Sequence, residues 1–262
     1  MKKTAYFFAL LLFIACTTVP LTGRKQMKII SDAELNAMAF QQYGQFIATA
    51  KLSSNKAQAA MIQRVGERIT NAVNEYLMTV DRQNITEGFE WEFNLVDDPS
   101  VNAWAMPGGK IVFYSGILPL CQDEAGVAVV MGHEIAHIIA GHGNERMSQG
   151  LLANLGIAAL DQALQKEPEK TRNILLGAVG AGAQVGILLP FSRTHEKEAD
   201  RLGLIFMTMA GYDPHSAPAF WERMMEMSAG NEPPEFLSTH PSSASRVADL
   251  KASIPEALSY KN

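Results

Sequence analysis

The sequence predicts an α+β domain that is mostly helical and carries a small β-sheet beside one central helix. Stretches with the periodicity of amphipathic helices cover most of the chain. Alternation of apolar and polar residues is confined to one region, 91–114. Soon after this region, Ala125 to Ala140 is apolar, lacks proline and carries no charge except Glu134. Such a stretch is typical of a buried helix, and we expect the sheet to lie beside it.

The first fifteen residues have the pattern of a signal peptide rather than of a folded element. Lys2 and Lys3 provide a positive start, and the eleven apolar residues 5–15 are too few to cross a bilayer. Ala15, a small residue, precedes Cys16, which suggests lipoprotein processing with Cys16 as the acylated N-terminus. Ordinary secretion and an uncleaved anchor are the alternatives.

These features predict a location in the bacterial cell envelope. Lipid on Cys16 would anchor the chain to a membrane, facing the periplasm, with residues 16–30 as a tether. Thr17 follows the cysteine where Asp would mark inner-membrane retention, and this favours the outer membrane. The net charge of −5 gives no general attraction to nucleic acid or anionic lipid. Nucleic acid is therefore not an expected partner, and membrane binding is expected to come from the lipid.

Residues 31–262 have a length that suits a single domain with a sizeable core. Ser31 and Glu34 form the pattern of a capping box, so a helix is expected from about 32 to 50. A second amphipathic helix is expected from about 55 to 79. Both helices are expected to pack against the core.

The expected sheet has three candidate strands. Trp91 begins an alternating stretch that predicts a half-buried strand. Segments 101–106 and 110–114 are expected to pair through a turn at residues 107–109, which read Pro-Gly-Gly.

Residues 133–137, His-Glu-Ile-Ala-His, carry most of the functional information. On a helix, His133 and His137 are four residues apart and share one face, so both imidazoles can reach a single ion. Glu134 can stay outside the coordination shell and still take a proton from a water that the metal activates. This arrangement is what a zinc peptidase needs. A helix with two buried, satisfied histidines is the alternative.

A catalytic zinc site needs a third protein ligand, and Glu196 is our candidate. It opens the run Glu-Lys-Glu-Ala-Asp at 196–200, which is expected to be helical. Asp200 lies one turn further on the same face, where it can accept a hydrogen bond from a ligating histidine. Glu198 points away from that face. A solvated charged face is the alternative interpretation of this run.

Together these motifs resemble the HtpX and CaaX-prenyl-protease type of zinc metallopeptidase, metallopeptidase family forty-eight. The stretch before the helix, 102–116, resembles the family's segment, as do Gly141-His142-Gly143 and the later Thr239-His240-Pro241-Ser242 with Arg246. The likeness covers about residues 55–255. The short periplasmic lipoprotein members have the most similar layout.

The resemblance implies a zincin-like fold, one Zn²⁺ per chain and endoproteolysis of protein or peptide substrates. We expect His133, His137 and Glu196 to bind zinc and Glu134 to act as the general base. Misfolded or unassembled envelope proteins are the expected substrates. The alternative is an envelope chaperone or assembly factor that uses the same zinc fold as a binding module.

Further expectations concern residues around this centre. His240 is expected to donate to the oxyanion of the reaction, or to occupy the open zinc position in a latent enzyme. A fourth protein ligand would instead make the zinc purely structural. Asn102 and Ala103 are candidates for a sheet edge that binds extended substrate, against an ordinary core hairpin.

The region between the two metal motifs is expected to hold two helices, 151–164 and 174–189. The second is uncharged and interrupted by glycines, each of which lowers helix stability by roughly 1 kcal/mol relative to alanine. We therefore expect a mobile lid over about 150–192, with a rigid core pair and a transmembrane hairpin as alternatives.

Overall fold

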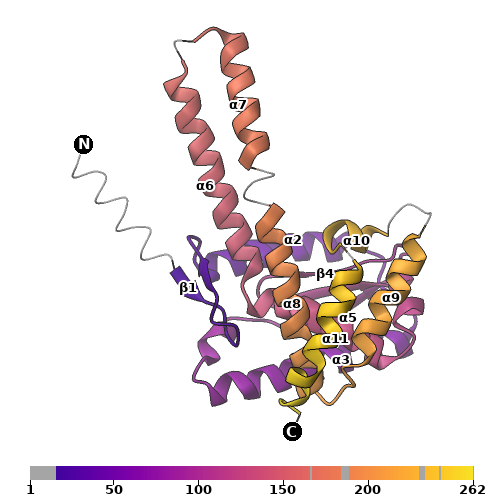
Figure 1. Cartoon of the computed structure of the whole chain (residues 1–262). Helices are drawn as coiled ribbons and strands as arrows, with labels where there is room; N and C mark the ends of the chain where they lie inside the picture. The colour runs from indigo at the N-terminus through magenta and orange to yellow at the C-terminus, as the bar shows by residue number, and fades with distance from the viewer. Residues whose placement is uncertain (1–15, 166, 184–188, 230–233, 242, 262) are drawn as a thin grey trace.

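The computed structural model describes residues 16–165, 167–183, 189–229, 234–241 and 243–261 (Figure 1). Helices surround the central helix α5 (Glu124–Ile139), and a small sheet lies beside it. The predicted α+β, mainly helical fold is confirmed. The short elements between the sheet and the central helix are η1 (Gln83–Thr86), η2 (Ser115–Ile117) and α4 (Leu118–Cys121).

The two helices predicted before the sheet form close to their expected bounds. α2 (Asp32–Thr49) begins at Ser31, whose side chain accepts a hydrogen bond from the backbone N–H of Glu34 at 3.2 Å. This bond satisfies one of the free N–H groups of the first turn. α3 (Lys56–Thr79) begins at Asn55 in the same way, and its apolar face is fully buried.

The sheet has the strand order β3-β5-β4, which leaves β4 at an edge. β4 (Ala103–Met106) and β5 (Lys110–Tyr114) form the predicted antiparallel pair, turning through glycines with positive φ. β3 (Glu92–Val96) pairs with β5 in parallel. Only β4 contacts the central helix extensively, so this edge strand is the part of the sheet nearest to the histidines.

A close helix crossing holds the core together. α8 (Leu189–Met209) packs against α5 where Gly132 faces Gly203. A Cβ on Gly203 would lie 2.8 Å from the backbone N of His133, and one on Gly132 would lie 2.7 Å from the Gly203 carbonyl oxygen. The two backbones therefore approach as closely as glycine allows, which brings the second metal motif against the first.

Three further helices complete the packing on the α8 side. α9 (Ser216–Ser228) contacts α5, α11 (Ala244–Leu258) contacts α8 and α9, and α10 (Glu235–Thr239) lies between α9 and α11 in sequence. Ser243 caps α11 by accepting from the backbone N–H of Arg246. Arg246 is thereby fixed in the first turn of the helix.

The expected tether over residues 16–30 is wrong. β1 (Cys16–Thr18) and β2 (Lys25–Met27) form an antiparallel hairpin, and Val19 between them is 1% exposed. Arg24 adds ion pairs to Glu145 and Glu198. Burial of Val19 and the ion pairs of Arg24 fix this segment in place. The polar composition of the segment gives no sign of either interaction in the sequence. The predicted signal peptide, 1–15, lies outside the described residues.

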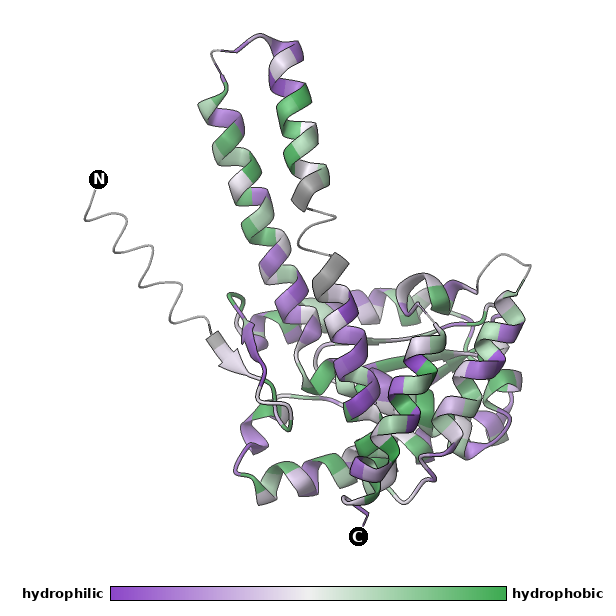
Figure 2. Ribbon diagram, in the orientation of Figure 1, coloured by the Kyte–Doolittle hydropathy of each residue, from purple (hydrophilic) through white to green (hydrophobic). Residues whose placement is uncertain are grey.

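Two helices project from the body as a hairpin, α6 (His142–Ala163) and α7 (Glu169–Ala183) (Figure 1). Figure 2 shows apolar positions along both helices, and Leu151, Leu155 and Ile174 are exposed. The pair is therefore not a rigid core pair. No helix within the described part of the chain is both long and apolar enough to cross a bilayer. The lid stays a prediction.

The helix crossing predicts a sharp contrast between two glycines. Gly203→Ala should lower the free energy of unfolding by about 1–3 kcal/mol, because the added methyl group overlaps the α5 backbone. Gly150→Ala on α6 should be neutral or raise it by up to about 1 kcal/mol, since nothing lies within 4 Å of its added Cβ. Urea unfolding measures both. Equal stability of the two variants would contradict the proposed contact.

Candidate metal centre

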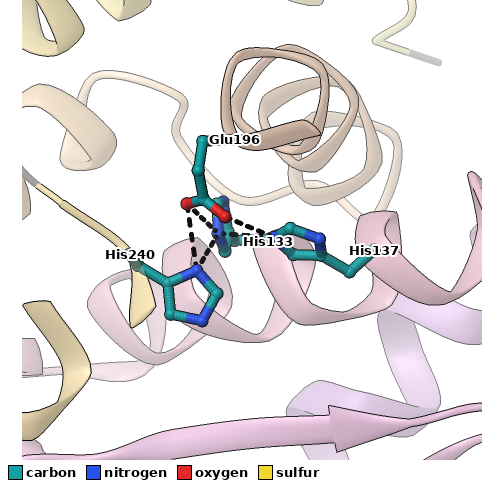
Figure 3. A group of neighbouring side chains, drawn as sticks. All are labelled: His133, His137, Glu196 and His240. Carbon is teal, nitrogen blue, oxygen red and sulfur yellow. Dashed lines mark hydrogen bonds and ion pairs between the residues drawn. The ribbon is translucent and has the colours of Figure 1, made fainter. Parts of the chain in front are cut away.

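Three helices bring four side chains together (Figure 3). His133 and His137 come from α5, Glu196 from α8, and His240 directly follows α10. One donor atom of each lies within 4.8 Å of every other. α5 places its two histidines on one face because they are four residues apart. Its start is capped by Asp123, which accepts from the backbone N–H of Gly126 at 2.9 Å.

The spacing of these donor atoms fits a small tetrahedral cation. His133 Nε2 and His137 Nε2 are 3.1 Å apart. The Glu196 carboxylate lies 3.3 Å from His137 Nε2 and 3.4 Å from His133 Nε2. Bond lengths of about 2.0–2.1 Å around tetrahedral Zn²⁺ give ligand–ligand separations of about 3.3 Å. The three residues can therefore hold a metal without rearrangement.

Hydrogen bonds behind the histidines assign their tautomers. His133 Nδ1 lies 3.0 Å from Asp200 Oδ1, so it donates to that carboxylate. His142 Nε2 donates to Glu198 at 3.0 Å, which leaves His142 Nδ1 as an acceptor. His137 Nδ1 donates to it at 2.8 Å. Both Nε2 atoms then face one point, where a metal ion, or a shared proton in its absence, can lie between them.

The ionisation of this cluster agrees with a cation site. For Glu196, burial raises the pKa, but hydrogen bonds from His133 and His137 outweigh it and hold the pKa below its usual range. Burial lowers the pKa of His137 well below its usual value. Burial also lowers the pKa of His133, but Asp200 and Glu196 raise it to about 9. A metal ion would therefore displace a proton from the cluster.

Asp200 is itself held by Arg246, which in turn stacks on Trp221. Arg246 donates to both Asp200 oxygens, at 2.6 and 2.7 Å, and its guanidinium lies 3.4 Å from the centre of the Trp221 ring. The sequence pointed to Arg246 as part of the C-terminal motif that resembles the family's. It gave no signal for Trp221, because a tryptophan on an amphipathic helix looks like any core residue.

Glu134 lies beside the cluster and is 3% exposed. Its Oε1 lies 3.4 Å from His240 Nε2 and has no hydrogen-bond partner among the described residues. Burial raises its pKa, against the opposing effect of the charges of His240 and His133. A buried carboxylate oxygen without a donor is costly, and a raised pKa suits a group that takes up a proton.

The structure separates the two residues predicted for a substrate-binding edge. The Asn102 carbonyl accepts from the Tyr114 backbone N–H at 3.0 Å, so this residue faces β5 rather than the edge. By the alternation of an antiparallel ladder, the backbone groups of Ala103 and Ala105 point away from β5. The free edge nearest the metal motif therefore belongs to Ala103 and Ala105.

The remaining histidines occupy distinct places. His142 is fully buried behind His137, and His195 pairs with Glu145 at 2.9 Å. His215 is exposed and pairs with Asp213. Glu198 does point away from the cluster, as predicted. The sequence did not show that it would meet His142 from behind.

Comparison with known proteins places the chain among metallopeptidases. It matches Peptidase family M48 over residues 56–254. It is similar to the mitochondrial metalloendopeptidase OMA1 of Schizosaccharomyces pombe, 38% identical over 174 residues, 64% of this chain and 48% of that protein. Metalloendopeptidase OMA1 of Danio rerio is 30% identical over 263 residues, 98% of this chain and 54% of that protein.

A bacterial relative is also similar. The β-barrel assembly-enhancing protease of Escherichia coli is 32% identical over 166 residues, 62% of this chain and 34% of that protein. The chain thus spans about half the length, or less, of these relatives.

These relatives overturn the predicted location. The OMA1 proteins, at up to 38% identity, are mitochondrial. The expectation of a lipid-anchored, periplasm-facing protein of a bacterial outer membrane is therefore wrong. A basic start with a short apolar run is common to several targeting segments, so the pattern alone does not determine a compartment. In the structure Cys16 opens β1, and its backbone pairs with Met27.

The charge cluster behind His137 predicts a dependence of stability on acid. In the fold, burial raises the pKa values of Glu145 and Glu198, but hydrogen bonds from His195, His142 and Arg24 hold both at about 2, below the ordinary value of 4.5. Their stabilising effect is complete above about pH 4.5 and is lost as the pH falls towards 2. Metal-free Glu145→Gln should therefore lose less stability than the parent over this window in urea unfolding. Parallel curves would contradict this.

Proposed function

Because the chain belongs to Peptidase family M48 over residues 56–254, we propose that it is a zinc-dependent metalloendopeptidase acting in protein quality control. The observation that carries this proposal is the tetrahedral spacing of three donor groups, from His133, His137 and Glu196, beside the buried Glu134. The relatives reported above are OMA1 and β-barrel assembly-enhancing proteases. They do not support the narrower likeness to the HtpX and CaaX-prenyl-protease type.

The donor set favours zinc, one ion per chain. Two imidazoles and one carboxylate are ligands that Zn²⁺ accepts in hydrolases, with a further position left for the reaction. A bound Zn²⁺ supplies Lewis-acid chemistry, because it polarises a carbonyl and makes water acidic enough to lose a proton near neutral pH. Asp200 keeps the His133 ring in the orientation and tautomer that ligation requires.

Glu134 is the proposed general base. Its buried carboxylate lies on the same helical turn as His133, within reach of a water at the cluster. It would take the proton of the attacking water and deliver it to the leaving amine. Its raised pKa brings it nearer to neutral pH, where a carboxylate can perform both transfers.

The substrate is proposed to bind as an added strand. Ala103 and Ala105 point their backbone groups away from β5 at the edge of the sheet nearest to α5. Main-chain hydrogen bonds to such an edge bind an extended peptide with little regard to its sequence. Only an unfolded or loosely held segment can adopt that form, so misfolded proteins are the proposed substrates.

His240 supports a second candidate, a latent form of the same enzyme. Its Nδ1 lies 3.1 Å from His133 Nε2 and 3.0 Å from Glu196 Oε2, so it has the position of a fourth ligand. Four protein ligands close a zinc site. We therefore propose that hydrolysis requires His240 to leave this position.

Replacement of His240 tests the latent form. His240→Ala should keep the metal and cleave casein several-fold faster than the parent, because one coordination position is opened. The exposed His215→Ala is the matched control and should behave as the parent. A fall of about 10²-fold or more would instead assign His240 as an oxyanion donor. Absence of cleavage in every variant would favour a purely structural zinc.

Replacement of Glu134 tests the mechanism. Glu134→Gln should retain one zinc per chain but lose about 10²–10⁴-fold in casein cleavage, because no carboxylate remains to take the proton. The exposed Glu226→Gln on α9 is the control and should match the parent. Chelation should abolish parental cleavage and added zinc should restore it. Equal cleavage by Glu134→Gln and the parent would refute the assigned role. If the protein is instead a binding module, Glu134→Gln should keep its full function.

A further inference from the structure

We propose that Arg24, on the turn between β1 and β2, is a positioning residue for the metal ligand His137. This inference rests on the proposed function, since it assigns His137 to the metal. Arg24 lies before the residues 56–254 that match the peptidase family, and it does not touch the metal cluster. It acts through a buried relay of two side chains, Glu198 and His142.

The relay is continuous in hydrogen bonds. Arg24 Nε donates to Glu198 Oε2 at 2.7 Å. The same oxygen accepts from His142 Nε2 at 3.0 Å. His142 Nδ1 then accepts from His137 Nδ1 at 2.8 Å. His142 is 0% exposed and Glu198 is 8% exposed, so little solvent reaches these two side chains.

The position of the Glu198 carboxylate decides which nitrogen of His137 carries the proton. While the carboxylate accepts from His142 Nε2, His142 Nδ1 has a free lone pair and His137 holds its proton on Nδ1. If the carboxylate turned away, His142 could carry its proton on Nδ1 instead. His137 would then have to hold its own proton on Nε2, the atom that faces the metal. The relay thus keeps the ligating lone pair of His137 available.

Arg24 is held in the geometry that this relay needs. Its two terminal nitrogens donate to both oxygens of Glu145, at 3.0 and 2.7 Å. Glu145 also accepts from His195, whose ring stacks on His142 at 4.3 Å with an interplanar angle of 20°. Two carboxylates therefore clamp the guanidinium, and a stacked ring limits rotation of His142. This planar fork suits arginine and not lysine.

The turn that carries Arg24 is built to grip Glu198. Leu21 and Gly23 both have positive φ, 64° and 67°. Leucine is strained in that region, and such strain persists only when its surroundings enforce it. The turn presents a second donor, Thr22, to the other oxygen of Glu198. Two side chains from one tight turn thus fix one carboxylate.

Stability alone does not account for this cluster. A buried group of charges costs desolvation free energy, and apolar residues of similar volume are often as stable or more so. Six buried or half-buried polar side chains are therefore an energetically costly way to attach a hairpin. An effect of the cluster on the metal ligand His137 explains why charged side chains are found here. Packing alone does not explain it.

Zinc affinity tests the inference. In competition with a chromogenic chelator, Arg24→Gln in the full chain should bind Zn²⁺ about three- to tenfold more weakly than the parent, and His142→Phe about 10–100-fold more weakly. The matched control is Arg201→Gln on α8, which removes a bidentate ion pair with Glu256 but leaves the metal residues untouched. It should bind zinc as the parent does. Unchanged affinity in Arg24→Gln, or an equal loss in both arginine variants, would overturn the inference.

A second measurement separates positioning from folding. In metal-free protein with ¹⁵N-labelled histidine, the ring shifts of His137 should show a proton on Nδ1 in the parent and a mixture in Arg24→Gln. Once His142→Phe is present, adding Arg24→Gln should weaken zinc no further, because the path is already cut. Additive losses, or an unchanged tautomer, would refute the relay. If Arg24→Gln does not fold, Arg24→Lys replaces it, with a smaller loss of the same sign expected.

A failure of the proposed function would look different. A parent protein that binds no zinc would refute the metal centre, while the His137 tautomer would still report on the relay. A parent that binds zinc but cleaves nothing would refute hydrolysis and leave the relay intact.

Discussion

The close crossing of α5 and α8 is the contact on which the rest of the structure depends. Gly132 and Gly203 let the two backbones touch, and this sets the depth at which Glu196 stands over the imidazoles of α5. A tetrahedral site tolerates displacements of only a few tenths of an ångström in its ligands. The separations of 3.3 and 3.4 Å between the Glu196 carboxylate and the two imidazoles therefore depend on two residues that have no side chains.

Around this crossing, two separate groups of side chains support the two histidines. Asp200, Arg246 and Trp221 support His133 from the α11 side. Glu198 and His142 support His137 from the side of the N-terminal hairpin. The two histidines thus have separate supports of different chemistry, a direct carboxylate for one and a second imidazole for the other. Both supports leave the same nitrogen, Nε2, facing the cluster.

Sequence reasoning placed side chains correctly where local spacing determines their position. The four-residue separation of His133 and His137, and that of Glu196 and Asp200, determine a shared helix face before any tertiary structure is known. Sequence reasoning failed where packing between distant segments determines the structure. The parallel pairing of β3 with β5, the folded hairpin at residues 16–30 and the stacking of Arg246 on Trp221 each depend on chain segments far apart in sequence. A charged residue such as Arg24 looks solvated in a sequence, whatever it meets in the fold.

The cluster is assembled from distant parts of the chain, since His133 and His240 are 107 positions apart in the sequence. A fragment that ends before Glu196 contains only two of the four residues of this cluster. During synthesis on the ribosome, the pentapeptide therefore emerges well before the proposed metal centre can form.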